Sequence, residues 1–185
     1  MNTGDITLKW FKKQKFVLQN TSNKPSIDGV ICKKLSPIVD DRGDLTELWS
    51  TGWPDSSNFL QPVHCYQSTT RSGVTKGWHL HKSHISQIAI TKGKLQLVLV
   101  DVRLGSNTFG ITNNMYVGIE NPSLVKIPSG IMYAWKALSQ SEVIVTSFHP
   151  HLYDPEEDFH FSIESILSHV WDGTRPDQPS LPEKS

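Results

Sequence analysis

His79 and His81 are the two side chains in this sequence that are best placed for proton transfer or for metal binding. They lie in the segment Lys76–Lys82, and glycines at positions 73 and 93 bracket that segment. If the segment is a β-strand, both imidazoles point to one face, because side chains on a strand repeat every two residues. Imidazoles exchange protons near neutral pH and are common metal ligands. We therefore expect this pair to form the centre of a functional site on the inner wall of a β-structure.

The middle of the chain predicts short strands that are separated by turns. The segment Lys94–Arg103 alternates, with Leu95, Leu97 and Leu99 on one side, which predicts a half-buried antiparallel strand. Turn signals every several residues favour a sandwich or barrel over alternating strands and helices. The other predicted strands are Gly29–Cys32, Leu45–Trp49, Leu60–Thr69, Ser86–Thr91, Leu124–Ile127, Ile131–Leu138 and Glu142–Phe148.

The two ends of the chain differ from the middle. Residues 1–25 mix aromatic and basic residues, including Trp10 and Phe11, and predict an arm that packs on another surface. Residues 26–160 form the predicted barrel, and residues 161–185 the predicted C-terminal helix and tail. The helix is predicted by apolar residues at helical spacing, with Ser162 as a cap and Gly173 as a stop; these residues are Ile163, Ile166, Leu167 and Val170.

The composition excludes several classes of protein. The 18 basic and 18 acidic residues give a formal net charge of zero, and no basic stripe indicates a nucleic-acid partner. No apolar run approaches the roughly 20 residues that span a bilayer, and the polar N-terminus lacks the apolar core of a signal peptide. Cys32 and Cys65 are not spaced as a metal or redox pair and lie in apolar stretches. We expect buried thiols in a cytoplasmic protein.

The segment from Gly73 to Gly93 resembles the first sequence motif of the cupins, and Ile127–Tyr133 resembles the second. The resemblance implies a mainly β fold, the jelly-roll barrel or double-stranded β-helix. Metal-binding cupins supply further ligands where this sequence has Ser86 and Tyr133. Two histidines alone hold a metal ion poorly, although His64 or His84 could add to them. We therefore expect no metal and no other cofactor.

A second resemblance extends over residues 28–158, where the order and spacing of several motifs are similar to those of the dTDP-4-dehydrorhamnose 3,5-epimerase family. The similarity implies epimerisation of a nucleotide-linked 4-keto-6-deoxy sugar in glycan biosynthesis, and a homodimer. The segments that carry it are Asp41–Glu47, Gly73–His79, Val100–Gly110, Glu120–Asn121, Ile127–Gly130 and Tyr153–Glu157.

The same resemblance implies roles for individual residues. His79 is expected to be the base that removes a proton next to the ketone, with His81 and Tyr133 as further catalytic candidates. Arg42 and Lys76 are expected to hold the diphosphate or the sugar. The remaining residues of the predicted binding site are Glu47, Gln61, Trp135 and Tyr153.

The strand at Glu142–Phe148 lacks the tyrosine that serves as the acid in the epimerase family. Tyr133, or less directly Tyr66, could replace it, because a phenol on the inner wall can donate a proton. Two other functions stay open. The segment His79–Lys82 also resembles the sugar 3,4-ketoisomerases, which are cupins that move a keto group along the same kind of substrate. A barrel without the acid could also bind a sugar nucleotide without catalysis.

Overall fold

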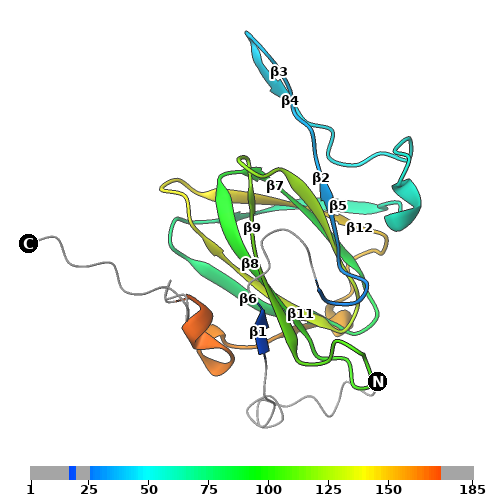
Figure 1. Ribbon diagram of the computed structural model, residues 1–185, viewed down its shortest axis with the longest axis vertical. Coiled ribbons are helices and arrows are strands. Elements are labelled where there is room, and N and C mark those ends of the chain that lie inside the picture. Colours follow the sequence, from blue (N-terminus) through cyan, green and yellow to red (C-terminus); the bar gives the residue numbers. More distant parts are fainter. Residues whose placement is uncertain (1–16, 20–25, 172–185) are drawn as a thin grey trace, which may run out of the picture.

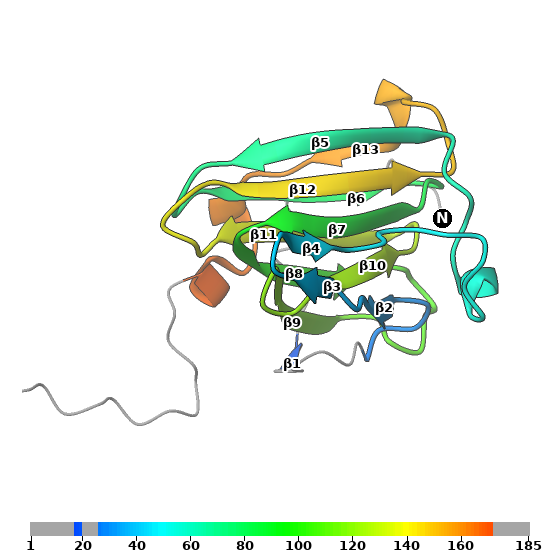
Figure 2. The ribbon, with the colours of Figure 1, turned by 90° about the horizontal axis from the view of Figure 1, so that it is seen from above.

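Two β-sheets that face each other form the body of the described structure, as Figures 1 and 2 show. The computed structural model describes residues 17–19 and 26–171. Across the six-stranded sheet the order is β1 (Val17–Gln19), β9 (Ile111–Gly118), β8 (Lys94–Asp101), β11 (Ile131–Ala137), β6 (Thr75–His81) and β13 (Asp158–His160). Across the five-stranded sheet it is β2 (Ile31–Lys34), β10 (Ser123–Ile127), β7 (Ser86–Lys92), β12 (Val143–His149) and β5 (His64–Thr70).

The main core lies between the two sheets. Leu95, Leu97 and Leu99 of β8 are fully buried in it, as their alternation predicts. They pack with inward side chains of the facing sheet, such as Val125 of β10 and Val145 of β12. The predicted jelly-roll barrel is therefore confirmed.

A second core covers the outer face of β8. Val98 and Val100 point away from the first core and are also fully buried, packed with Trp78 and Ile166. The amide of Gln96 donates to the carbonyl of Val170, 3.0 Å away. The prediction that this strand is half-buried is therefore wrong, because the C-terminal segment returns to shield its second face.

The predicted C-terminal helix is present as two short 3-10 helices, η4 (Ile163–Ser165) and η5 (Ser168–Trp171). Between them Ile166 is extended and Leu167 has a φ of 50°, so no continuous α-helix forms. The apolar side chains at 166 and 170 are buried as the pattern predicts. No side-chain hydrogen bond from Ser162 caps η4, and Gly173 lies outside the described residues.

A hairpin of β3 (Ile38–Asp40) and β4 (Gly43–Leu45) extends away from the barrel, as Figure 1 shows. The turn at 41–42 matches the predicted turn, but the strand expected to begin at Leu45 ends there. Beyond it the chain carries the short helix η2 (Ser56–Asn58) and packs Trp49 and Trp53 against a small third core. The hairpin is therefore a two-stranded sheet of its own, with no strand paired to either sheet of the barrel.

Three sequence-based expectations concern the rest of the chain. Trp10 and Phe11 of the predicted N-terminal arm lie outside the described residues. Both cysteines are free, but Cys65 is exposed and Cys32 only partly buried, so the prediction of two buried thiols is wrong. Among the described residues, no helix has the length and apolar character needed to cross a membrane.

Candidate functional site

The strand β6 carries the two histidines on one face, as the period of two predicts. Trp78 and Leu80 point to the second core, while His79 and His81 point to the interior between the sheets. The side chains of the two histidines are 20% and 15% exposed, so both are shielded but reachable. The pair is brought together as expected.

Asp158 is the acidic partner of this pair, and the sequence reasoning missed it. It lies on β13, which pairs with β6 so that Asp158 is opposite His81 and His160 is opposite His79. A carboxylate oxygen of Asp158 lies 4.0 Å from Nδ1 of His79 and 3.9 Å from Nδ1 of His81. Its other oxygen lies 3.0 Å from Nε2 of His160. The spacing of Asp158 and His160 fits one face of a strand, but only the pairing with β6 reveals their neighbours.

His79 is held between aromatic rings. Its ring stacks on Trp135 at 5.2 Å and meets the edge of His160 at 4.8 Å. Burial, and then the charge of His160, lowers the pKa of His79 from 6.5 to about 4. Its Nε2 has no hydrogen-bond partner among the described residues. His79 is therefore neutral at pH 7, with Nδ1 facing a carboxylate and Nε2 buried without a hydrogen-bond partner among the described residues.

His81 has a different environment, because its Nε2 shares a hydrogen bond of 3.2 Å with the hydroxyl of Tyr133. That hydroxyl also lies 3.3 Å from the hydroxyl of Ser86. Tyr133 is 6% exposed, and burial raises its pKa well above the ordinary value. Ser86 and Tyr133, which stand where metal-binding cupins have ligands, thus form a buried hydroxyl network with His81.

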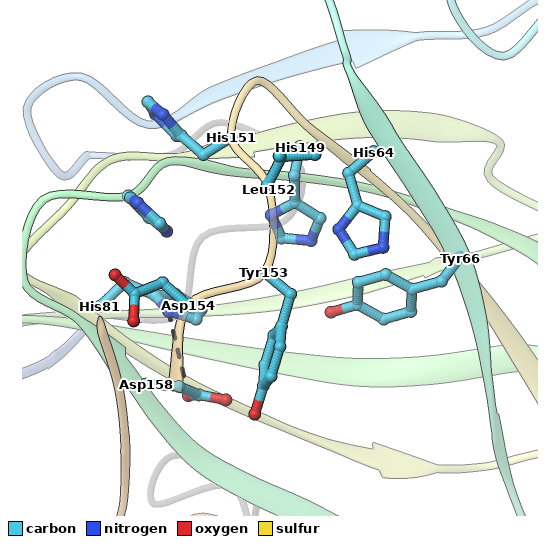
Figure 3. A pocket seen from close by; sticks show the side chains of 10 residues that line it. His64, Tyr66, His81, His149, His151, Leu152, Tyr153, Asp154 and Asp158 are labelled. Atoms are coloured by element: carbon cyan, nitrogen blue, oxygen red, sulfur yellow. Dashed lines mark ion pairs between the residues drawn. The ribbon is translucent and has the colours of Figure 1, made fainter. Parts of the chain in front are cut away.

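A pocket opens beside these residues, and Figure 3 shows its lining. His81 and Asp158 form one side, while Tyr66 from β5 and His149 from β12 form the other. Of the eight histidines in the chain, five line this pocket: His64, His81, His84, His149 and His151. The sequence reasoning missed His149, the last residue of β12, and His151, two residues beyond it; the pairing of β12 with β5 brings them to the pocket.

Three of the predicted binding residues lie near the two histidines. Tyr153 lines the pocket, and Trp135 stacks on His79 while its indole N–H donates to Thr70 over 2.9 Å. The ammonium of Lys76 donates to Ser68 and to the carbonyl of Thr69.

The other three predicted binding residues are not brought to the pocket within this chain. Arg42 lies on the β3–β4 hairpin and pairs with Asp40. Glu47 is exposed and accepts a hydrogen bond from the indole of Trp53. Gln61 is exposed before β5. These three residues can therefore bind the substrate as predicted only at a site to which a second chain contributes.

Within residues 17–19 and 26–171, one group of side chains could hold a metal ion: His79, Asp158 and His160, whose ligand atoms lie within 4.8 Å of one another. Imidazole nitrogens and a carboxylate oxygen suit Zn²⁺. The same side chains form the His–Asp contacts described above, although one carboxylate oxygen of Asp158 is buried without a hydrogen-bond partner among the described residues. The sequence expectation of no metal stays a prediction.

The sequence pattern of the dTDP-4-dehydrorhamnose 3,5-epimerase family matches residues 24–182. The chain belongs to this family. The expected family, and with it the class of carbohydrate epimerases, is confirmed. The match spans the barrel, the His-rich strand and the C-terminal segment, so it covers every residue of the candidate site.

Relatives agree with the family. The spore coat polysaccharide biosynthesis protein SpsL of Bacillus subtilis is 34% identical over 132 residues, which is 71% of this chain and 85% of that protein. A probable low-salt glycan biosynthesis epimerase of Haloferax volcanii is 28% identical over 72% of this chain and 85% of its own length. The crystal structure of a dTDP sugar isomerase from Desulfovibrio desulfuricans superposes with a TM-score of 0.73 at 22% identity, covering 80% of this chain and 94% of that one.

Proposed function

We propose that the protein inverts a carbon next to the ketone of a nucleotide-linked 4-keto-6-deoxy sugar, in the synthesis of a polysaccharide or another glycan. One observation carries the proposal: a neutral imidazole, His79, faces the carboxylate of Asp158 through Nδ1 and keeps Nε2 unpaired. The arrangement is that of an oriented base. Family membership and the glycan-biosynthesis relatives support the substrate class.

The chemistry starts with the acidity of a C–H bond next to a ketone. His79 accepts that proton on its imidazole ring, and the electron pair of the C–H bond moves into an enolate. Asp158 stabilises the imidazolium that results, because opposite charges within about 4–6 Å favour each other. His81 is the weaker candidate for the base, because its Nε2 is already engaged by Tyr133.

We also propose that the protein is a homodimer. Three apolar side chains of the projecting hairpin are uncovered: Ile38, Val39 and Leu45 are 71%, 74% and 64% exposed. The same hairpin carries Arg42. In a dimer, its positive charge could contact an anionic substrate that the neighbouring subunit binds. Multi-angle light scattering at micromolar concentration is expected to give twice the chain mass, and a monomer under these conditions would overturn this proposal.

We place the protein in the cytoplasm. The support is chemical: Cys32 and Cys65 are free, and free thiols persist in reducing compartments. Fractionation of the source cells with an antibody against the chain tests the placement, and recovery outside the cytoplasm contradicts it.

Deuterium exchange tests the reaction. The protein is incubated in deuterated water with a dTDP-linked 4-keto-6-deoxy sugar, and the products are followed by NMR. Label at carbon 3, at carbon 5 or at both, with inversion, is expected and identifies the epimerised centres. Label at carbon 3 with a 3-keto product would instead identify a ketoisomerase, and binding without exchange would identify a non-catalytic protein.

The variant His79→Asn tests the base. It is expected to slow exchange by about 10²–10⁴-fold, the usual contribution of a general base. His169→Asn is the matched control, because His169 is exposed on η5 and does not line the pocket. Normal exchange by His79→Asn, with loss of exchange in His81→Asn, would move the base to His81.

A further inference from the structure

The family resemblance implies an acid tyrosine on strand β12. This strand instead has Ser147, which faces Tyr66 on the neighbouring strand β5. In the ladder between β12 and β5, Ser147 is directly opposite Tyr66, and His149 is directly opposite His64. Residues directly opposite each other in an antiparallel ladder place their Cβ atoms about 5 Å apart on the same face. A hydrogen bond joins the side chains of Tyr66 and Ser147. The phenol therefore occupies the neighbourhood that a long side chain at Ser147 would occupy.

Tyr66 enters the pocket from the sheet opposite to the base. Strand β5 is the edge of the five-stranded sheet, whereas β6 and β13, which carry His79 and Asp158, belong to the other sheet. Figure 3 shows the hydroxyl of Tyr66 directed into the pocket from the side opposite His81 and Asp158. Its ring stacks almost parallel on His149, with centroids 5.3 Å apart and planes 6° apart. The stack fixes the direction of the phenol.

We propose that Tyr66 is the acid of the epimerisation, and that it delivers a proton to the face of the sugar opposite His79. This inference rests on the function proposed above. It replaces Tyr133 in that role, since the buried hydroxyl of Tyr133 is already hydrogen-bonded to His81 and Ser86, whereas Tyr66 lines the pocket.

The protonation state of Tyr66 agrees with this role. Burial raises its pKa above 10, the hydrogen bond from Ser147 acts against the rise, and the charges of Asp158 and Tyr153 add to it. The phenol therefore keeps its proton at neutral pH and can give it to a carbanion, which is a far stronger base.

The proton balance is complete without a co-reactant. His79 takes the C–H proton and becomes an imidazolium, and the enolate holds the electron pair. The enolate carbon then forms a new C–H bond with the proton of Tyr66, and the O–H bond breaks to leave a phenolate. Tyr66 regains a proton from water, and the imidazolium loses its proton to water, so both groups return to their initial state.

The variant Tyr66→Phe separates the two half-reactions. Without the acid, His79 can still remove a proton and return deuterium to the same face. We therefore expect label to enter the substrate at close to the wild-type rate, while the inverted product forms about 10²–10⁴-fold more slowly. Circular dichroism and binding of dTDP verify that the variant is folded. Tyr116→Phe is the matched control, since Tyr116 lies on β9 away from the pocket and is expected to invert normally.

The outcomes distinguish this inference from the proposed function. A wild-type protein with neither exchange nor inversion overturns the proposed function itself. An active wild type together with normal inversion by Tyr66→Phe overturns the role of Tyr66 alone. Equal loss of exchange and inversion in a folded Tyr66→Phe protein also overturns it, because that pattern indicates a role in positioning the substrate. Loss of inversion with retained exchange in Tyr133→Phe, but not in Tyr66→Phe, would assign the acid to Tyr133.

Discussion

Gly77 lies directly against Ala134. A methyl group on Gly77 would stand 2.5 Å from the Cβ and 2.7 Å from the Cα of Ala134, and the φ of Gly77 is 125°. This close approach lets β6 lie beside β11 with His79 turned to the interior. The glycine between Lys76 and Trp78 is thus required by space as well as by backbone conformation.

Gly77→Ala is therefore expected to destabilise the protein by about 3 kcal/mol or more, because overlap and a left-handed backbone each cost about 1–3 kcal/mol. Urea denaturation measures the loss. Gly105→Ala is the control, since Gly105 also has a positive φ of 86° but nothing lies within 4 Å of the added methyl group. Equal losses in the two variants would contradict the steric explanation.

Asp101 holds together the segment Val100–Gly110, which was identified above only by its resemblance to the epimerase family. Its carboxylate is 0% exposed and accepts hydrogen bonds from Arg103, Ser106 and Thr108, at 2.6–2.9 Å. Asp101→Asn turns one acceptor into a donor that faces other donors. We expect a loss of about 3 kcal/mol in the free energy of unfolding. Asp44→Asn, on the exposed hairpin, is expected to stay within about 0.5 kcal/mol.

Acid is expected to destabilise the protein between pH 6.5 and pH 4. Burial lowers the pKa of His79 and of His149 to about 4 in the folded chain. In this window the unfolded chain binds protons at these positions and the folded chain does not, so stability falls as the pH falls. Thermal melts across this range measure the effect, and His149→Asn should make the dependence of Tm on pH shallower. A constant Tm from pH 7 to pH 4.5 would contradict this expectation.

We expect the reaction to need no metal ion, so EDTA should leave the rate unchanged. Added Zn²⁺ should inhibit, because His79, Asp158 and His160 offer it ligand atoms within 4.8 Å and binding would occupy the base. The concentration of Zn²⁺ that halves the rate is the measurement. His160→Asn should raise it by about tenfold or more. Stimulation by Zn²⁺, or inactivation by EDTA, would show that the metal is required.

The sequence predicted what depends on neighbours along one strand. The shared face of His79 and His81 and the inward leucines of β8 follow from a period of two, and both are confirmed. The partners that lie on other strands were not predictable in this way. Asp158 and His149 reach the site only because β13 pairs with β6 and β12 pairs with β5.

The same limit explains the errors of the sequence analysis. The side chains on the outer face of β8 are partly polar, which predicts exposure. That face is covered by the C-terminal segment, which follows more than sixty residues later in the chain. The apolar spacing at the C-terminus predicts a helix, and it does bury Ile166 and Val170. The segment does so with two short 3-10 helices, separated by the extended Ile166 and by Leu167 at a φ of 50°, in place of one α-helix.

The pairing of Tyr66 with Ser147 bears on how activity is inferred from homology. Two positions that are 81 residues apart in the chain reach one volume of space, because a ladder joins them. A catalytic group can therefore move from one strand to its neighbour while the reacting atoms stay in place. Compared column by column, such an enzyme looks as though it has lost a catalytic residue. Compared by the contents of its pocket, it has not.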